Sequence, residues 1–525
     1  MKKTPSLSKI LMALIVLLTS ISAYSQTFEV VSNTRSGLEL SLKIDDFAIE
    51  DDHITLSGIF LPNVAGMPDL PVVSRYVAIP RGANVVLNVK NQVTETVSDV
   101  EIMPAPALPL DNDDTPMQYI RDEKVYSTNA FYPAEPVMAS KPTKIRDVDV
   151  ALVSVTPFQY NPVTKELIVT KKLDLEVVFE GGDGVFGGDP RYRSEAWDHI
   201  IRDMVINESI LPDADYQNFI KNAVQRRDTG CEYLIITPDN PDFIALADSI
   251  KLFRNQQGIL TDVVTITECG GNNQTAIRNY IRDAYNNWDI PVSAVLLLGD
   301  HNGDGTQGIV SYSMNNHPGG GGYNPYISDN KYGDVNSDHL PEVVMGRITG
   351  RDYDEMYHMI NKDLQFERHP STNPRFYDKP ITAMGFQHER WFQLCSEIVN
   401  GFWEHELGKH PVRINAIYEG TPGSSWSSAQ HTNTILNYFG PHGLGYIPQY
   451  MSHLTEWNGT GNQINEAINA GAFILQHRDH GAEELWGEPS YSIGYINRLV
   501  NPDLTFVMSN NCLTGRFNYN AGAGQ

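Results

Sequence analysis

Two side chains near the end of the 525-residue chain can together carry out nucleophilic chemistry. Cys512 supplies a thiol, and His480 supplies an imidazole. A thiolate is a strong nucleophile, and a neighbouring imidazole lowers the thiol pKa and later protonates the leaving group. Either residue by itself is more often structural, since a free cysteine is usually a small buried side chain. The pair therefore matters only if the fold brings the two together.

Two short apolar runs, at 472–475 and 504–508, precede these residues and have the length of buried parallel strands. Apolar residues recur at helical spacing between 493 and 500, and Asn-Pro-Asp at 501–503 ends that pattern. The stretch is thus predicted to form a strand, a crossover helix and a second strand. Parallel sheets bind ligands at the carboxyl ends of their strands, so His480 and Cys512 are expected to face one crevice.

The sequence here resembles the gingipain family of cysteine peptidases, in the clan that also contains caspases and legumain. The resemblance is carried by HGAE at 480–483, by Trp486 and by CLTGRF at 512–517. It extends from about residue 230 to the last residue, notably in EYLIITPDN, LFRNQQG and AVLLLGDH. It implies an α/β fold with a caspase-like, doubly wound and mostly parallel sheet.

The resemblance also implies roles for individual residues. Cys512 attacks the scissile carbonyl, His480 protonates the departing amine, and the backbone N–H groups of Gly481 and Cys512 stabilise the oxyanion. Gingipains carry an acidic residue that orients the histidine, after the strand that matches 381–386. Glu389 is the nearest candidate in this chain, with Gln387 and His388 beside it, and the alternative is a carboxylate that interacts with a helix N-terminus.

The chain before residue 228 is expected to contain a signal peptide and a β-rich domain. Two lysines, an apolar run at 10–21 and small residues at 23–25 predict a secretory signal peptide over 1–25 and hence a secreted or cell-surface protein. No other window reaches the roughly 18 apolar residues of a membrane-spanning helix.

The net charge of -25, from 39 basic and 64 acidic residues, argues against a nucleic-acid groove.

Residues 26–227 alternate in short segments separated by Gly, Pro, Asn and Asp, which is typical of β-structure. The Gly-rich stretch at 181–190 is expected to be a hinge. Because gingipain precursors carry a β-rich prodomain, the resemblance implies an inhibitory propeptide, and a carbohydrate-binding or adhesion module is the alternative. Arg227, in an exposed basic pair, is the expected cleavage site unless the pair occurs there by chance.

From residue 228 to 525 strands alternate with helices, which predicts the doubly wound α/β domain. Strands are expected at 233–237, 261–266, 293–298, 342–347, 381–386 and 412–418, with helices at 243–253, 275–287, 353–367, 391–405 and 427–439. The resemblance implies a domain that continues beyond residue 525, so the chain is expected to be truncated.

One Asp-rich loop is a candidate calcium site. Asp334, Asn336, Asp338 and Glu342 alternate the hard oxygen ligands that Ca²⁺ prefers, and a polar Asx turn leading into a strand explains them equally well. A calcium ion would brace the sheet edge, as in the gingipain family. No cofactor is expected to take part in catalysis.

Two function classes remain at this stage. The first is a secreted cysteine endopeptidase made as a zymogen, acting on polypeptides and inhibited by its own propeptide. The second is a gingipain-like protein that is specialised or inactive as a protease and acts in surface-protein secretion or assembly. The segment 391–394 contains no carboxylate that could select a basic P1 residue, so a preference for arginine or lysine is not expected. A pocket for a hydrophobic or aromatic P1 side chain agrees with the sequence equally well.

Overall fold

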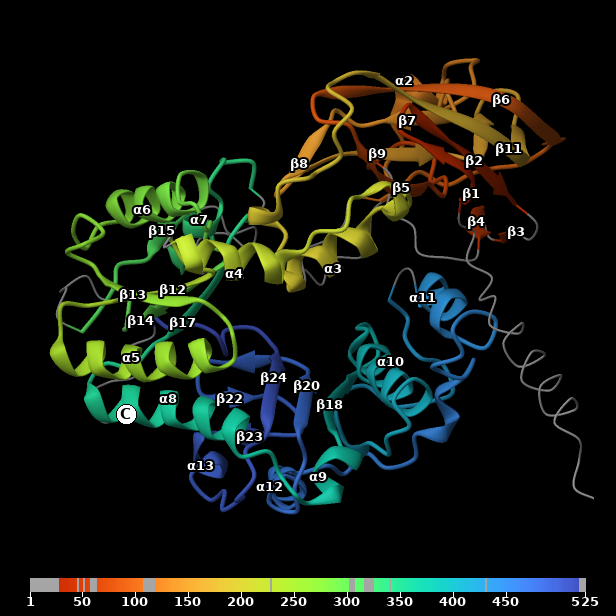
Figure 1. The fold of residues 1–525 in the computed structure, drawn as a ribbon. Coiled ribbons are helices and arrows are strands. Elements are labelled where there is room, and N and C mark those ends of the chain that lie inside the picture. The colour runs from red at the N-terminus through yellow and green to blue at the C-terminus, as the bar shows by residue number, and fades with distance from the viewer. Residues whose placement is uncertain are drawn as a thin grey trace, which may run out of the picture.

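The computed structural model describes residues 28–44, 47–50, 52–56, 64–106, 119–226, 229–301, 307–315, 325–339, 341–429 and 432–518. The expected signal peptide and Arg227 lie outside these residues. Figure 1 shows three successive parts, which are a β-rich domain, a connector with helices, and an α/β region. No helix in the described part of the chain has both the length and the apolar character needed to cross a bilayer.

The β-rich domain is built from antiparallel strands. β1, β2, β11 and β10 form one sheet in that order, with β6 also paired to β11, while β5, β9 and β7 form another, with β8 paired to β9. In β11, Leu173, Leu175 and Val177 are buried and alternate with more exposed neighbours, as expected for a strand with one face on the core. The bounds are β1 Glu29–Thr34, β2 Gly37–Lys43, β3 Phe47–Glu50, β4 His53–Leu56, β5 Val73–Ile79, β6 Ala83–Val97, α2 Glu123–Tyr126, β7 Val137–Ala139, β8 Thr143–Ile145, β9 Val148–Val155, β10 Phe158–Asn161 and β11 Glu166–Gly181.

The connector leads from β11 to the α/β region through η1 (Pro190–Tyr192), α3 (Glu195–Met204), η2 (Glu208–Ile210) and α4 (Tyr216–Arg226). Its Gly-rich start, which was expected to be a hinge, packs on the β-domain. Phe186 is buried, and the Arg81 backbone N–H donates to Val185 at 2.8 Å. A Cβ on Gly187, whose φ is +34°, would meet Val148 Cγ2 at 2.5 Å. Hinge motion at this segment stays a prediction.

The first α/β sheet has the order β13-β12-β14-β17, and all its pairs are parallel. Alternate residues of β12 point to opposite cores: Leu234 and Ile236 pack with α6, and Ile235 packs with α5 and α8. Figure 1 accordingly shows α5 and α8 on one face of the sheet and α6 and α7 on the other. The bounds are β12 Tyr233–Thr237, α5 Pro241–Gln256, β13 Thr261–Thr265, α6 Gln274–Asn286, β14 Ala294–Leu298, β15 Tyr312–Met314, β16 Tyr326–Ser328, α7 Asn330–Gly333, β17 Val344–Ile348, α8 Tyr353–Arg368 and α9 Pro374–Asp378.

The second α/β sheet has the order β19-β18-β20-β24 and is also parallel. β18 is buried along its whole length: Ile381 and Ala383 pack with α12, and Met384 and Phe386 pack with α10. The bounds are β18 Ile381–Gln387, α10 Phe392–His405, β19 Val412–Glu419, α11 Thr432–Phe439, η4 Met451–His453, α12 Gly461–Asn469, β20 Ile474–Arg478, β21 Gly481–Ala482, β22 Leu485–Trp486, β23 Tyr491–Ser492, α13 Ile493–Ile496 and β24 Phe506–Asn510.

The predicted alternation of strands and helices in parallel sheets, after a β-rich N-terminal region, is confirmed. The expectation of a single sheet is wrong for the described residues, which form two separate four-stranded parallel sheets, although helices cover both faces as expected for a doubly wound fold. The caspase-like arrangement stays a prediction. The crossover helix expected over 493–500 is also shorter, because α13 ends at Ile496 and a small antiparallel sheet of β21, β22 and β23 takes up most of the connection.

Candidate active site

The pairing of β20 with β24 brings the two sequence-predicted catalytic segments together. The strands are parallel, and Arg478 lies opposite Asn510 at their carboxyl ends. His480 follows Arg478 by two residues, and Cys512 follows Asn510 by two residues. The two residues therefore lie at equivalent positions after the ends of paired strands. This is the sheet edge at which parallel folds place ligands.

Asn511 joins the two segments directly. Its Nδ2 lies 3.1 Å from the His480 carbonyl oxygen and 3.0 Å from that of Asp479. Gly481 makes the second close contact, since a Cβ at this position would meet Asn511 Cβ at 2.7 Å and the Cys512 carbonyl oxygen at 3.1 Å. Glycine is thus required here by the approach of the Cys512 segment.

Cys512 is exposed and sits at a tight turn. The Thr514 backbone N–H donates to the Cys512 carbonyl at 2.8 Å, and Leu513 between them has a φ of 63°. A non-glycine residue rarely adopts this left-handed conformation, and such strain is concentrated at functional sites. The turn therefore fixes the position of the segment that carries the thiol.

The remaining cysteines have different surroundings. Cys231 and Cys269 are buried, and burial raises the pKa of each thiol to about 12. Cys395 is partly buried, and all four cysteines are free. An accessible thiol is a prerequisite for a nucleophile, so the contrast in exposure favours Cys512.

The His480 ring is held by the neighbouring strands β18 and β19. Its Nε2 lies 2.8 Å from Gln387 Oε1, and because an amide oxygen can only accept, Nε2 is the donor. Gln387 Nε2 in turn donates to Glu419 Oε2 at 3.0 Å. The rings of Tyr418 and Phe392 contact the imidazole at centroid distances of 4.5 and 5.2 Å. The proton on Nε2 leaves the lone pair of a neutral ring on Nδ1.

Glu389, the candidate for an orienting acid, lies on the exposed turn after β18. The structure places Gln387, two residues earlier, against the histidine instead. The physical reason is that β18 continues one residue beyond the expected end of the strand, and its last side chain is buried and faces the His480 ring. Gln387 was named only as a neighbour of Glu389, because its amide is uncharged and the family's orienting residue is acidic.

Asp479 was not singled out from the sequence. Its carboxylate is buried, accepts a hydrogen bond from the Glu488 backbone N–H, and has one oxygen, Oδ1, without a partner. Burial raises the pKa of Asp479 to about 6, while backbone hydrogen bonds from His480 and Glu488 oppose the shift. A Cβ on Gly385 would meet this carboxylate at 2.4 Å. Asp479 thus fixes the loop after β20, which contains His480, to the backbone at Glu488.

His477 was also missed, and it lies on the strand itself. Its Nδ1 is 2.8 Å from Asn511 Nδ2, and its Nε2 is 3.1 Å from the Glu488 carbonyl. Its ring stacks on Trp486 at 4.1 Å, and burial lowers the pKa of His477 to about 4. A neutral, fully bonded imidazole is a structural support, so His477 holds Asn511 in place.

The Asp-rich loop at 334–342 is held by hydrogen bonds in the structure. Glu342 Oε2 accepts from the Val335 backbone N–H at 2.9 Å, and Asn336 Nδ2 lies 2.6 Å from Glu342 Oε1 and 3.1 Å from Asp338 Oδ2. Asp334 Oδ1 accepts from the Ser337 backbone N–H at 2.7 Å. Among the described residues no three His, Cys, Asp or Glu side chains converge on a metal position. The present geometry is that of a polar turn, with an amide N–H group between the carboxylates, and calcium binding stays a prediction.

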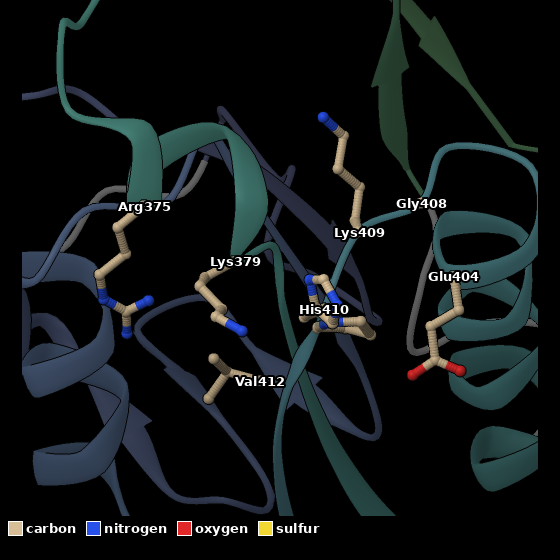
Figure 2. Close-up of a pocket in the computed structure, with 8 residues that line it drawn as sticks. Arg375, Lys379, Glu404, Gly408, Lys409, His410 and Val412 are labelled. Carbon is tan, nitrogen blue, oxygen red and sulfur yellow. The ribbon is translucent and has the colours of Figure 1, made fainter. Parts of the chain in front are cut away.

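A cavity of about 570 Å³ lies at the opposite end of the second sheet. Figure 2 shows its lining, in which Arg375, Lys379 and His410 surround the start of β19 at Val412. His410 Nδ1 lies 2.7 Å from Asp378, and Lys379 Nζ lies 3.3 Å from it. Because Val412 begins β19 whereas His480 comes after the end of β20, this cavity is separate from the candidate active site.

Family models and individual relatives point to the same peptidase family. The model of "Peptidase family C25" matches residues 226–524, and the model "Propeptide_C25" matches residues 53–186. Gingipain R1 of Porphyromonas gingivalis is 24% identical over 463 residues, which cover 86% of this chain and 40% of the relative. Gingipain R2 of the same organism is 24% identical over 471 residues, covering 87% of this chain and 54% of the relative. The chain thus spans about half the length of these relatives, or less.

Two solved structures from the same group were also found. The crystal structure of the Arg specific cysteine proteinase gingipain R has a TM-score of 0.41 and 18% identity, covering 55% of this chain and 56% of that chain. The complex of Porphyromonas gingivalis RgpB pro- and mature domains has a TM-score of 0.30 and 21% identity, covering 35% of this chain and 97% of that chain. The resemblance inferred from the sequence is confirmed by the family models, the first of which covers more than half of the residues: this chain belongs to peptidase family C25 and carries that family's propeptide domain.

Proposed function

We propose that the chain is a cysteine endopeptidase made as a zymogen, with Cys512 as the nucleophile and His480 as its acid–base partner. The observation that carries the proposal is the register of β20 and β24, which places both residues two positions beyond paired strand ends. Membership of a cysteine peptidase family supports the reaction class. The Asn511 contacts support the close approach of the two segments.

The tautomer of His480 suggests how the proton moves. With Nε2 donating to Gln387, Nδ1 takes the proton from the Cys512 thiol. The thiolate then forms a C–S bond with the scissile carbonyl carbon, and the carbonyl electron pair moves onto oxygen. The backbone N–H groups of Gly481 and Cys512 stabilise that oxyanion. When the C–N bond breaks, the imidazolium protonates the departing amine, and water, deprotonated by His480, hydrolyses the thioester.

The substrate and the setting are inferred from the family. Polypeptides are the substrates, and the β-rich domain is the inhibitory propeptide, released by cleavage near Arg227. A signal peptide over 1–25 directs export to the cell surface or beyond it. The absence of a carboxylate at 391–394 leaves a pocket for a hydrophobic or aromatic P1 side chain as well supported as one for arginine or lysine.

The proposal is tested by labelling with iodoacetamide below the ordinary thiol pKa of roughly 8.5. Cys512 should react there, whereas the buried thiols of Cys231 and Cys269 should not. Cys512→Ala should abolish both the labelling and peptide hydrolysis while leaving the melting temperature unchanged. Full hydrolysis by Cys512→Ala would show that this residue is not the nucleophile.

One observation favours a second candidate function, a specialised or inactive relative that acts in surface-protein assembly. The side chain bonded to His480 is the neutral amide of Gln387, and the nearest carboxylate in that chain of bonds, Glu419, contacts the amide rather than the ring. An amide stabilises an imidazolium less than a carboxylate does. A panel of irreversible peptidyl electrophiles varying at P1 separates the two functions. Labelling of Cys512 by some panel members supports a peptidase, and labelling by none supports the alternative.

A further inference from the structure

One side chain makes direct hydrogen bonds between the β-domain and the α/β region. Arg146 lies in the turn between β8 and β9 and is only 4% exposed. Its Nη1 donates to the Glu342 carbonyl at 2.8 Å, and its Nη2 lies 3.4 Å from Ser293 Oγ. Both of these contacts join residues 28–186 to residues 229–518. Its Nε donates to the Tyr192 carbonyl of the connector at 2.7 Å.

Three aromatic rings complete the surroundings of this guanidinium. The carbon Cζ lies 5.1 Å from the ring centroid of Trp197, 5.3 Å from that of Tyr285 and 5.8 Å from that of Tyr192. Such distances allow cation–π attraction, which strengthens when the cation is removed from water. Trp197 and Tyr192 belong to the connector, and Tyr285 belongs to α6 of the first α/β sheet.

The charge balance of this contact is unusual. Among the described residues no carboxylate forms an ion pair with Arg146, although arginine stays protonated in proteins. Burial lowers the pKa of Arg146, and electrostatic interactions with Tyr285, Tyr216 and the Asp147 carboxylate oppose that shift. A buried cation that has only neutral acceptors is costly unless its donors are well matched. The backbone at Arg146 is also in the left-handed region, with a φ of 54°.

The position of the contact separates it from the candidate active site. Ser293 and Glu342 lie just before β14 and β17, so they are at the amino ends of neighbouring strands of the first sheet. His480 and Cys512 come after the carboxyl ends of strands in the second sheet. Figure 1 shows β8 on the side of the β-domain that faces α4 and the first sheet.

We propose that Arg146 is the anchor that keeps the propeptide domain on the α/β region after the connector has been cut, and that Tyr285, Ser293 and the Glu342 carbonyl form a guanidinium-binding surface for it. This inference rests on the zymogen organisation proposed above, and it adds a holding contact away from the catalytic residues. Lysine can replace the anchor only in part, because a single ammonium group lacks the planar fork that reaches acceptors on both sides.

The test uses the full chain with Cys512→Ala, which removes any cleavage by the protein itself. A recognition sequence for a site-specific protease is inserted between Arg227 and Asp228, the chain is cut there, and the dissociation rate of the two fragments is measured by size-exclusion chromatography after dilution. Arg146→Ala should speed dissociation by about 10- to 100-fold, the effect of losing hydrogen bonds to a charged group. Arg146→Lys should give a smaller increase. Arg81→Ala, which removes an exposed arginine of the same domain, should match the parent.

A variant on the opposite side keeps the test decisive if Arg146→Ala affects folding. Tyr285→Leu should also speed dissociation, and it should add no further effect when combined with Arg146→Ala, since the two side chains act on each other. The anchor is refuted if Arg146→Ala dissociates at the rate of the parent or of Arg81→Ala, if the two effects are additive, or if the cut parent separates at once. Because every variant lacks the thiol, this result is independent of whether the chain is a peptidase.

Discussion

Each of the two parallel sheets has a strand that leads into an Asp–His pair, and the two pairs are bonded differently. In the first sheet, Asp300 Oδ1 accepts from the His301 backbone N–H at 2.7 Å and lies 2.9 Å from that residue's own Nδ1. In the second sheet, the Asp479 carboxylate turns to the Glu488 backbone, and the His480 ring is left to bond with the adjacent strand β18.

The strands beside β14 and β20 also supply different kinds of side chain. Beside β14, β17 carries Arg347, which donates to the carbonyls of Gly299, Asp300 and Ile309 and pairs with Asp329 at 2.6 Å. Beside β20, β24 leads to the exposed thiol of Cys512. A histidine after a parallel strand is therefore not by itself a catalytic signal. What differs is the side chain supplied by the neighbouring strand. Arg347 on β17 holds the first pair in a hydrogen-bonded structure, whereas the segment after β24 supplies the exposed Cys512.

The largest expected effect comes from removing each histidine in turn. His480→Ala should lower kcat/KM by about 10³-fold or more, because general acid–base catalysis is lost. It should also move the reactivity of Cys512 with iodoacetamide toward that of an ordinary thiol. His301→Ala is the matched control and should lower both measurements far less, because within the described part of the chain His301 reaches the Cys512 segment only through a ring contact with Phe517 at 6.3 Å. Equal losses in the two variants would remove the distinction between the sheets.

The next effect concerns the partner of the His480 ring. Gln387→Ala should lower kcat by about 10-fold, the effect of losing one buried hydrogen bond that fixes the imidazole. KM should change little, because Gln387 acts on the ring and not on the substrate. Glu389→Ala should have no such effect, since this residue lies on an exposed turn. The reverse ranking, measured by steady-state kinetics, would restore Glu389 as the orienting residue.

A third test uses the buried carboxylate of Asp479. Since its pKa in the folded state is raised to about 6, its contribution to stability is fully present below the unfolded pKa of 3.8 and is lost as the pH rises through 6. Asp479→Asn should therefore increase the free energy of unfolding above pH 6 by up to about 3 kcal/mol, and the gain should vanish near pH 4. His477 is present in both proteins, so its titration cancels in the difference. Urea unfolding across this pH range provides the measurement, and a gain independent of pH would contradict the assignment.

The smallest expected effect is that of calcium on the loop at 334–342. A bound cation would relieve repulsion among clustered carboxylates, so calcium should raise the melting temperature by about 2–4 °C. Glu342→Gln should reduce that response. An unchanged melting temperature on chelation, in protein first shown to be free of other metals, would leave the loop as the hydrogen-bonded turn seen here.

The sequence was most informative where burial covers both faces of an element. All the strands of the two parallel sheets were predicted, and β14 is buried as its continuous apolar run at 294–298 indicates. The expectation of a buried strand at 504–508 is wrong, because β24 is an edge strand among the described residues and exposes Phe506, Val507 and Met508. The predicted ends were less accurate. β20 runs to Arg478 and β24 to Asn510, past the last apolar residue of each run, because Gln476 and His477 are buried in polar contacts that no hydropathy pattern reveals.

The candidate site shows the same limit. Cys512 and His480 were proposed from residue type and strand ends, and Gly481 from its place after the histidine, and their catalytic roles stay predictions. Gln387 and Asp479 were missed because their roles depend on which side chain of β18 or of the strand-end loop faces inward. The crossover segment was predicted to be helical, but Trp486, Tyr491 and Tyr495 stack in succession at centroid distances of 5.0 and 5.3 Å. The helix is therefore limited to α13, and aromatic stacking connects its Tyr495 to the small antiparallel sheet.

Glu342 takes part in two bonding systems through different atoms. Its carbonyl accepts from Arg146, and its carboxylate closes the 334–342 loop. The two systems therefore meet in one residue. Suppose that a ligand of the loop changes the affinity between the propeptide and the α/β region by some factor. The ligand's own affinity must then differ by the same factor between the precursor and the released α/β region. If calcium is such a ligand, its concentration would shift the affinity with which a cut propeptide is held.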